Sequence, residues 1–138
     1  MEALEKVQLG TARHVVMSQE DRRRTAYHEA GHVMASWFLK DAPPVFKVSI
    51  IPRGKSLGAA WYLPEEHQII TKSQFFDAIC AALGGRASEE LVLNEISSNA
   101  LDDLERVTKQ AYNMVANYGL GNEIRNISYY DSTGKMEQ

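Results

Sequence analysis

Three residues within "TAYHEAGHVMASWFLK" (residues 25–40) have the types and spacing needed to bind a metal ion. His28 and His32 are four residues apart, so on a helix both imidazoles project from one face, one turn apart. Glu29 follows the first histidine and, at about 100° per residue, lies beside such an ion rather than on it. This H-E-x-x-H pattern is typical of metal-assisted hydrolysis, with the histidines as zinc ligands and the glutamate as general base.

The helix expected around these residues carries no charged side chain between Glu29 and Lys40. Small or apolar residues surround the histidines, and an apolar stripe runs along the opposite side. We therefore expect the helix to be covered on both sides, with the histidines facing an interior cleft. The alternative is a pair of core histidines that binds no metal, and the absence of charge around the pair favours the metal. The stripe consists of Ala26, Ala30, Val33, Met34, Trp37 and Phe38.

A catalytic zinc site needs a third protein ligand as well as a position for water. The helix expected over residues 99–118 offers Asp103, which the helical period places at the boundary between an apolar stripe and solvent, whereas Asp102 points away. The alternative for Asp103 is a first-turn residue that complements the helix dipole. Glu89 and Glu90 compete for the same role. Each of them fits better the role of a carboxylate that accepts the other N–H of a metal-bound histidine, or a position on the surface.

Capping residues and prolines delimit the first elements. Ser18, with Asp21 three residues later, predicts the start of the histidine helix, and "DAPP" ends it after Lys40. Segments 45–51 and 57–63 are rich in strand-forming residues and predict a hairpin or small sheet. The residues before the first helix, about 1–13, are expected to form a short helix or arm.

The second half of the chain is expected to be mainly helical. Thr71 begins a helix that either breaks at Gly84-Gly85 or continues through "RASEELVL". Asn99 is expected to cap the last helix and Gly119 to end it, followed by a loop with at most one short strand. The predicted fold is therefore mainly α with a small β-hairpin or sheet.

Composition excludes several classes of function. The 138 residues suffice for one domain with its own core. A net charge of −3 argues against a nucleic-acid partner, and the basic run at Arg22–Arg24 is expected to be a solvated helical turn. No apolar stretch approaches the roughly 20 residues that cross a bilayer. No phosphate-binding G-x-x-x-x-G-K-[ST] loop is present. Cys80, the single cysteine, is expected to be a buried thiol.

Four segments in this order closely resemble the peptidase domain of FtsH-type membrane-anchored AAA+ metalloproteases: "TAYHEAGH", "KVSIIPRGKSLGAAWYLPEE", "LGGRASEEL" and "DDLERVTKQAYNMVANYGL". The resemblance covers about residues 4–131. It implies a zinc endopeptidase with one zinc ion per chain, bound by His28, His32 and Asp103, and with Glu29 as general base. The helical period had already favoured Asp103 as the third ligand.

The resemblance also implies a homo-hexamer that degrades unfolded or membrane-extracted proteins. ATP would be used only by an ATPase module, which is absent from these residues, as are the membrane anchor and the family's C-terminal helices. Residues 1–138 would be a single truncated peptidase domain, soluble by itself and on the cytoplasmic, matrix or stromal side in the full-length protein. The strand "KVSII", which includes Val48, Ser49, Ile50 and Ile51, or its hairpin partner, is expected to pair with an extended substrate.

One departure from the family lies just before the metal aspartate. The family's Thr-Gly-Ala is replaced by Ser98-Asn99-Ala100. Asparagine can adopt the left-handed conformation that glycine supplies, so we expect the loop to keep its shape. Two alternatives to a protease stay open at this point: a non-catalytic module with a degenerate site, and a zinc hydrolase of small substrates.

Overall fold

The computed structural model describes residues 17–54, 56–64 and 67–130, so the predicted N-terminal arm lies outside the described residues. A mainly helical fold with one small antiparallel sheet is confirmed. None of the helices described is long and apolar enough to cross a membrane. The elements are α2 (Gln19–Phe38), β1 (Val45–Ser49), β2 (Ala59–Tyr62), α3 (Lys72–Leu93), the 3₁₀ turn η1 (Ser98–Ala100), α4 (Leu101–Tyr112) and the π-helical turn η2 (Asn113–Asn117).

The predicted starts of the first two helices are confirmed. Ser18 Oγ accepts a hydrogen bond from the backbone N–H of Asp21 at 3.0 Å, and α2 begins at the next residue after this serine. Thr71 and Gln74 form a reciprocal capping box at the start of α3. This helix does not break at its two glycines but continues to Leu93, where Asn94 in the left-handed conformation (φ 57°) ends it.

The predicted role of Asn99 is wrong. The side chain of Ser97 caps η1 by accepting a hydrogen bond from the backbone N–H of Asn99 at 3.2 Å, and α4 starts afterwards at Leu101. Among the described non-glycine residues only Asn94 and Asn126 have a positive φ, so Asn99 is not left-handed. A 3₁₀ turn is open to any L-residue, and the loop therefore needs no glycine at this position.

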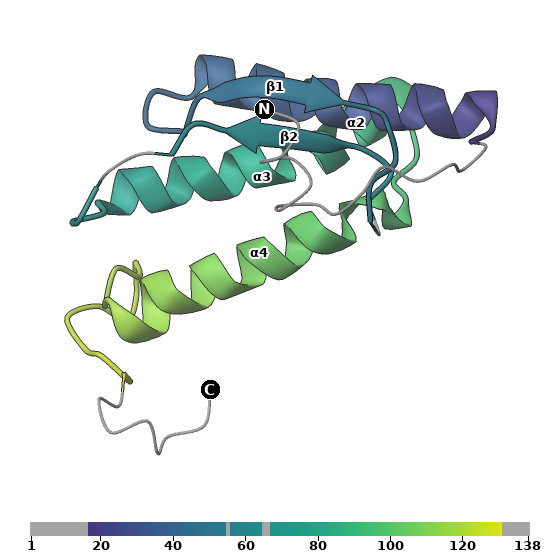
Figure 1. The fold of residues 1–138 in the computed structure, drawn as a ribbon. Helices are drawn as coiled ribbons and strands as arrows, with labels where there is room; N and C mark the ends of the chain where they lie inside the picture. Colours follow the sequence, from purple (N-terminus) through teal and green to yellow (C-terminus); the bar gives the residue numbers. More distant parts are fainter. Residues whose placement is uncertain (1–16, 55, 65–66, 131–138) are drawn as a thin grey trace.

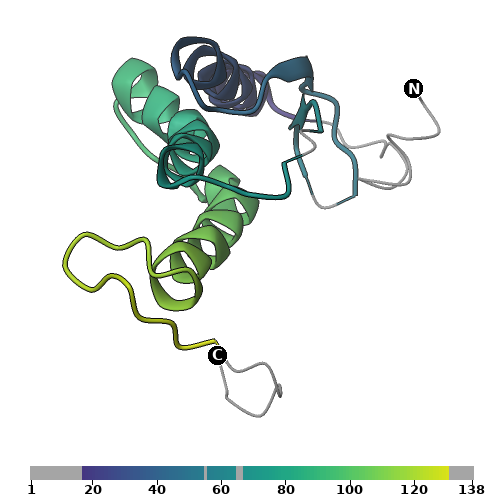
Figure 2. The same cartoon turned by 90° about the vertical axis from the view of Figure 1, so that its left-hand side faces the viewer.

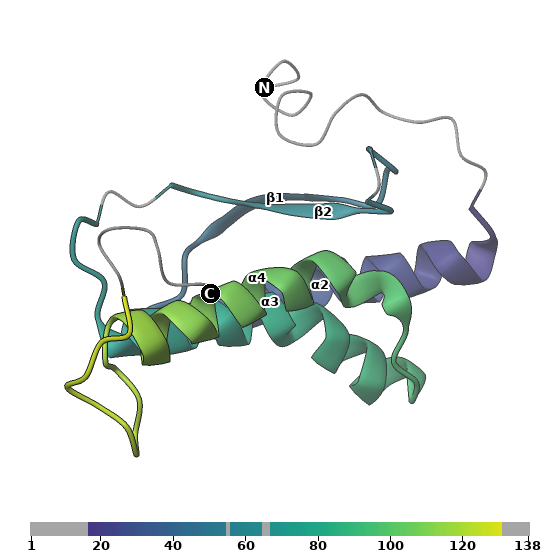
Figure 3. The same cartoon turned by 90° about the horizontal axis from the view of Figure 1, so that it is seen from below.

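The hairpin is shorter than the sequence predicts. β1 and β2 pair antiparallel from Val45↔Tyr62 to Ser49↔Ala59, with a register shift after the first pair. Figures 1 and 3 show both strands lying along one side of the helices, next to α2. In residues 119–130 the expected strand is reduced to an isolated bridge between Leu120 and Arg125.

Helices α2 and α3 touch through their backbones. A Cβ atom added at Gly31 would lie 2.2 Å from the carbonyl oxygen of Gly84, and one at Gly84 would lie 2.6 Å from the carbonyl oxygen of Gly31. Only glycine allows so close an approach, because any side chain would overlap the facing backbone. Seen roughly along their axes, α2, α3 and α4 are neighbours (Figure 2). The crossing presses the histidine-bearing face of α2 against α3.

The prediction that both faces of α2 are covered is wrong for the apolar stripe. Within the part of the chain that the structure describes, Trp37 is 80 % exposed and Phe38 is 74 % exposed. Only the opposite face, which carries the histidines, is buried, because its small and polar residues fit against α3 and the hairpin. These buried residues are Thr25, His28, Glu29, Gly31, His32 and Ser36. The buried apolar residues of the described part of the chain are Ala42, Trp61, Phe75, Ala81, Ala82 and Ala100.

Candidate metal centre

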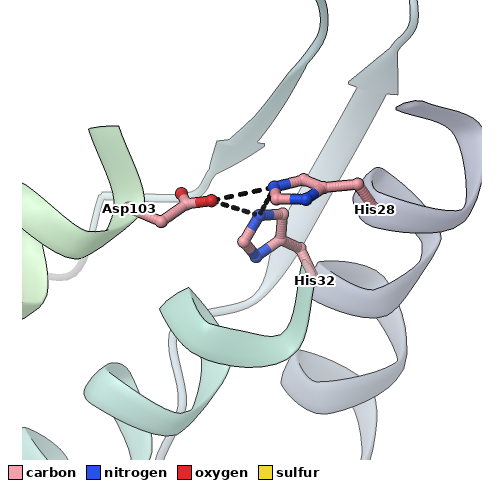
Figure 4. A group of neighbouring side chains, drawn as sticks. All are labelled: His28, His32 and Asp103. Atoms are coloured by element: carbon pink, nitrogen blue, oxygen red, sulfur yellow. Dashed lines mark hydrogen bonds and ion pairs between the residues drawn. The ribbon is translucent and has the colours of Figure 1, made fainter. Parts of the chain in front are cut away.

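Two histidines of α2 and one aspartate of α4 converge on a single point. His28 Nε2 and His32 Nε2 are 3.2 Å apart, and Asp103 Oδ2 lies 2.9 Å from the first and 3.2 Å from the second. Figure 4 shows the three side chains pointing toward one another from their two helices. Both histidines are buried, while Asp103 keeps partial access to solvent. The helical period of α4 therefore brings Asp103, and not Asp102, to the histidines.

In each imidazole, a hydrogen bond made by Nδ1 determines that Nε2 faces the point where the three side chains meet. His32 Nδ1 donates a hydrogen bond to the carbonyl oxygen of Ala81 at 2.8 Å, and His28 Nδ1 donates to Glu89 Oε2 at 2.7 Å. A carbonyl or an ionised carboxylate can only accept, so Nδ1 carries the hydrogen in both rings. In the neutral imidazoles both Nε2 atoms then present lone pairs, which face a carboxylate oxygen of Asp103.

Three acceptor atoms that face one another need a cation between them. Zinc binds imidazole nitrogen and carboxylate oxygen at about 2.0–2.1 Å, which puts tetrahedral ligand atoms roughly 3.3 Å apart. The three observed separations of 2.9, 3.2 and 3.2 Å are close to that spacing. His28, His32 and Asp103 therefore fit one zinc ion, and this donor set also suits other first-row divalent metals.

The electrostatics of the cluster favour a positive charge. Burial, the largest influence, lowers the histidine pKa values, but the hydrogen bonds and charges of Asp103 and neighbouring carboxylates outweigh it, so the pKa values of His28 and His32 are raised. Burial likewise raises the pKa of Asp103, but hydrogen bonds from the two imidazoles reverse this and hold that pKa well below its usual value. In the metal-free protein a proton therefore competes for the place of a metal ion.

Glu29 lies in the same cleft but outside the three-ligand cluster. Its side chain is buried, and Oε2 has no hydrogen-bond partner among the described residues. Burial, the largest influence, raises the pKa of this carboxyl above its ordinary value. A Cβ atom at Gly58 would lie 3.2 Å from Glu29 Oε1, so the loop before β2 comes close to the carboxylate. The site thus contains a buried carboxyl whose second oxygen is available to a ligand.

The cleft has a volume of about 330 Å³ and lies between α2, α4 and β2. Its wall includes Ala59, Ala60 and Tyr62 but none of residues 48–51 of the predicted substrate strand. Tyr62 contributes a buried hydroxyl with no partner in the described part of the chain, and burial raises its pKa to about 12. The hydroxyl thus stays protonated at neutral pH. The remaining wall is formed by Ser56, Leu57, Gly58, Ser98, Asn99, Leu101, Asp102 and Arg106 together with the metal-centre residues.

Several residues around the cluster have a burial or a hydrogen-bond partner that the sequence does not predict. Arg24 was expected in a solvated turn, but its side chain is only 18 % exposed and donates to Glu89 Oε1 at 2.8 Å. Glu89 is fully buried, whereas Glu90 is exposed, which separates two glutamates that the sequence left equivalent. Gly85 packs against the ring of His28. The one usable sequence signal was the spacing of Arg24, one helical turn before His28 and so on the same face.

A histidine pair on one helix, an aspartate from another that meets the pair, and a buried glutamate beside them are the arrangement typical of an H-E-x-x-H zinc metallopeptidase. The profile of Peptidase family M41 matches residues 15–138, and the chain belongs to this family.

Relatives across this family share the sequence at high identity. The chain is 58 % identical over 123 residues to the ATP-dependent zinc metalloprotease FtsH of Parabacteroides distasonis, covering 89 % of this chain and 18 % of that protein. It is 52 % identical over 125 residues to FtsH of Karelsulcia muelleri, covering 91 % and 20 %. It is 45 % identical over 129 residues to the mouse mitochondrial inner membrane m-AAA protease component AFG3L2, covering 93 % and 16 %. The chain thus spans about a fifth of the length of these relatives.

Proposed function

We propose that this chain is the peptidase domain of an ATP-dependent zinc metalloprotease and that it cleaves bonds within unfolded or membrane-extracted polypeptides. The observation that carries the proposal is the convergence of His28 Nε2, His32 Nε2 and Asp103 Oδ2 in a cleft that also holds the buried Glu29. The names of the relatives, which are ATP-dependent zinc metalloproteases, support the same reaction class.

His28, His32 and Asp103 would hold one zinc ion, which supplies Lewis-acid polarisation of a water molecule and of the scissile carbonyl. Glu29 takes the proton of the attacking water and later delivers it to the departing amine. Burial raises the pKa of this carboxyl above its ordinary value, which makes it a stronger base for the first of these steps. Glu89 holds the Nδ1 hydrogen of His28, which leaves Nε2 free for the metal.

We further propose that the substrate binds as an extended strand along β2. In the described residues β2 pairs with β1 on one side only, and its residues line the cleft. Val48 and Ser49 pair with Ala60 and Ala59 from the other side and so support the proposed substrate strand from behind. Ile50 and Ile51 follow in the hairpin connection. Pairing through the main chain gives affinity with little dependence on side chains, which suits a protease of unfolded chains.

The assembly belongs to the same proposal. The resemblance to FtsH-type proteases supports a homo-hexamer in the full-length protein, anchored in a membrane. The 138 residues contain no phosphate-binding G-x-x-x-x-G-K-[ST] loop, so ATP would be used elsewhere in the full-length protein. Its role would be to deliver polypeptide to the cleft.

The test is a Glu29→Gln variant of the full-length protein, with the exposed Glu90→Gln as matched control. Glu29→Gln should keep about one zinc per chain by elemental analysis but lose at least about 100-fold in the hydrolysis of unfolded casein, because the general base is gone. The control should keep both properties. Continued cleavage by Glu29→Gln would overturn the assignment of the base, and a wild-type protein that binds no zinc would overturn the metal centre.

A further inference from the structure

Glu89 is a fully buried carboxylate whose two oxygens are both hydrogen-bonded. Oε2 accepts from His28 Nδ1 at 2.7 Å, while Oε1 accepts from Arg24 Nη1 at 2.8 Å and from Ser97 Oγ at 2.6 Å. Three donors, one of them the positively charged Arg24, thus surround the two oxygens, and the carboxylate acts only as an acceptor.

This anion makes the two ligand histidines unequal. His32 donates its Nδ1 hydrogen to a neutral backbone carbonyl, whereas His28 donates to a charged carboxylate. A carboxylate partner fixes the orientation of the ring and makes the opposite nitrogen a stronger metal ligand. The metal-binding strength of His28 thus depends on whether the Glu89 carboxylate stays in place against Nδ1.

Arg24 and Ser97 each have a second contact, with the segment that leads into α4. The same Arg24 Nη1 donates to the carbonyl oxygen of Glu95 at 2.8 Å. Ser97 Oγ caps η1 through the backbone N–H of Asn99, and the Ser97 carbonyl accepts from Arg86 Nη2 at 3.1 Å. These bonds hold residues 95–100 against α2 and α3. Asp103 follows in the first turn of α4, so its position depends on the same segment.

From these contacts we propose that Arg24 and Ser97 are positioning residues of the metal centre. They join His28 and Asp103, which lie on different helices, through one buried carboxylate and the turn beside it. Neither residue touches the metal position itself. This inference rests on the proposed function, since it assigns how the proposed zinc ligands are held.

The experiment measures zinc affinity by competition with a chromophoric chelator, using full-length Arg24→Gln and Ser97→Ala proteins. Both should bind zinc about 10- to 100-fold more weakly than the wild type, the range usual for loss of groups that orient metal ligands. Ser97→Thr keeps a hydroxyl and should restore most of the affinity. The exposed Arg22→Gln, on the same helix as Arg24, and the exposed Ser73→Ala, at the start of α3, are controls and should bind zinc like the wild type.

Two further readouts separate positioning from general stability. Unfolding of the metal-free proteins in EDTA shows how far each variant destabilises the fold, and Ser97→Ala should lose more zinc affinity than Ser97→Thr even at similar stability. Cobalt(II) bound in place of zinc should show shifted visible absorption bands in Arg24→Gln and Ser97→Ala, because its bands report ligand geometry. If Arg24→Gln does not fold, the Ser97 pair decides the question.

The outcomes distinguish this inference from the proposed function. Wild-type zinc affinity in both Arg24→Gln and Ser97→Ala, alongside loss of zinc in Asp103→Ala, would overturn the positioning role and leave the metal centre standing. Equal weakening in Ser97→Ala and Ser97→Thr would also overturn it. A wild-type protein that binds neither zinc nor cobalt would overturn the proposed metal centre, and this inference with it.

Discussion

Gly85 of α3 lies directly against the imidazole of His28 on α2. A Cβ atom at this glycine would be 2.5 Å from His28 Nε2 and 2.6 Å from Cδ2, well inside van der Waals contact. The nitrogen concerned is the one that faces His32 and Asp103. The absence of a side chain on α3 therefore gives the first histidine room to approach His32 and Asp103 at the proposed metal position.

Gly85→Ala should weaken zinc binding although it favours the helix. In an ordinary helix this change stabilises by about 1 kcal/mol. Here the added methyl group must push the ring of His28 away from His32 and Asp103, so we expect at least about a 10-fold loss of zinc affinity. Chelator competition measures it, with the exposed Glu90→Ala on the same helix as control. Unchanged zinc affinity in Gly85→Ala would contradict this prediction, because it would mean that the ring of His28 can shift without weakening zinc binding.

The two neighbouring aspartates of α4 should differ in zinc content. Asp103→Ala removes one of the three converging atoms and should lose the bound zinc, whereas Asp102→Ala should keep about one zinc per chain. Asp102 is exposed, and its Oδ2 accepts a hydrogen bond from Ser56 Oγ at 3.4 Å. Elemental analysis after dialysis measures both. Loss of zinc from both variants, or from neither, would contradict the assignment of Asp103.

The placement of the three converging residues could be predicted from the sequence, because it depends on helical periodicity alone. His28 and His32 share a face through their four-residue spacing, and Asp103 is turned toward the interior by its phase on α4. The sequence could not choose between Glu89 and Glu90 in the same way. Their difference depends on how α3 is rotated against α2, which a single sequence does not contain.

The buried face of α2 was harder to predict for a physical reason. Hydrophobic periodicity assumes that the apolar stripe faces the core. In this chain the close contact of Gly31 with Gly84 selects the opposite face, and within the described residues Trp37 and Phe38 are left exposed. The contact of Arg24 is unpredictable for a different reason. A basic run is usually solvated, and the partner that removes Arg24 from solvent, Glu89, lies on another helix.

The helix crossing itself should be intolerant of a methyl group. In Gly31→Ala the new Cβ would lie 2.2 Å from the carbonyl oxygen of Gly84, so the two helices must separate. We expect a loss of about 3 kcal/mol or more in the free energy of unfolding, at the upper end of the usual cost of overpacking. Urea denaturation of the metal-free protein measures it. Ala30→Ser, at the exposed neighbouring position, should cost no more than about 0.7 kcal/mol. Equal stabilities of the two variants would contradict the close contact.

Cys80 should react slowly with alkylating reagents. Cys80 is half-buried and not the fully buried thiol that the sequence predicts. This burial, and then the negative charge of Asp77, raise the pKa of the thiol above its ordinary value of 9.0. A raised pKa means less thiolate at a given pH, and the thiolate is the nucleophile. At pH 8 the reaction with iodoacetamide should therefore be slower than that of the same cysteine in the urea-unfolded protein, and its rate should still be rising with pH beyond 9. Mass spectrometry can follow the reaction, with Cys80→Ser as the unlabelled control because Cys80 is the only cysteine. A rate that levels off below pH 9 would mean that the thiol is activated.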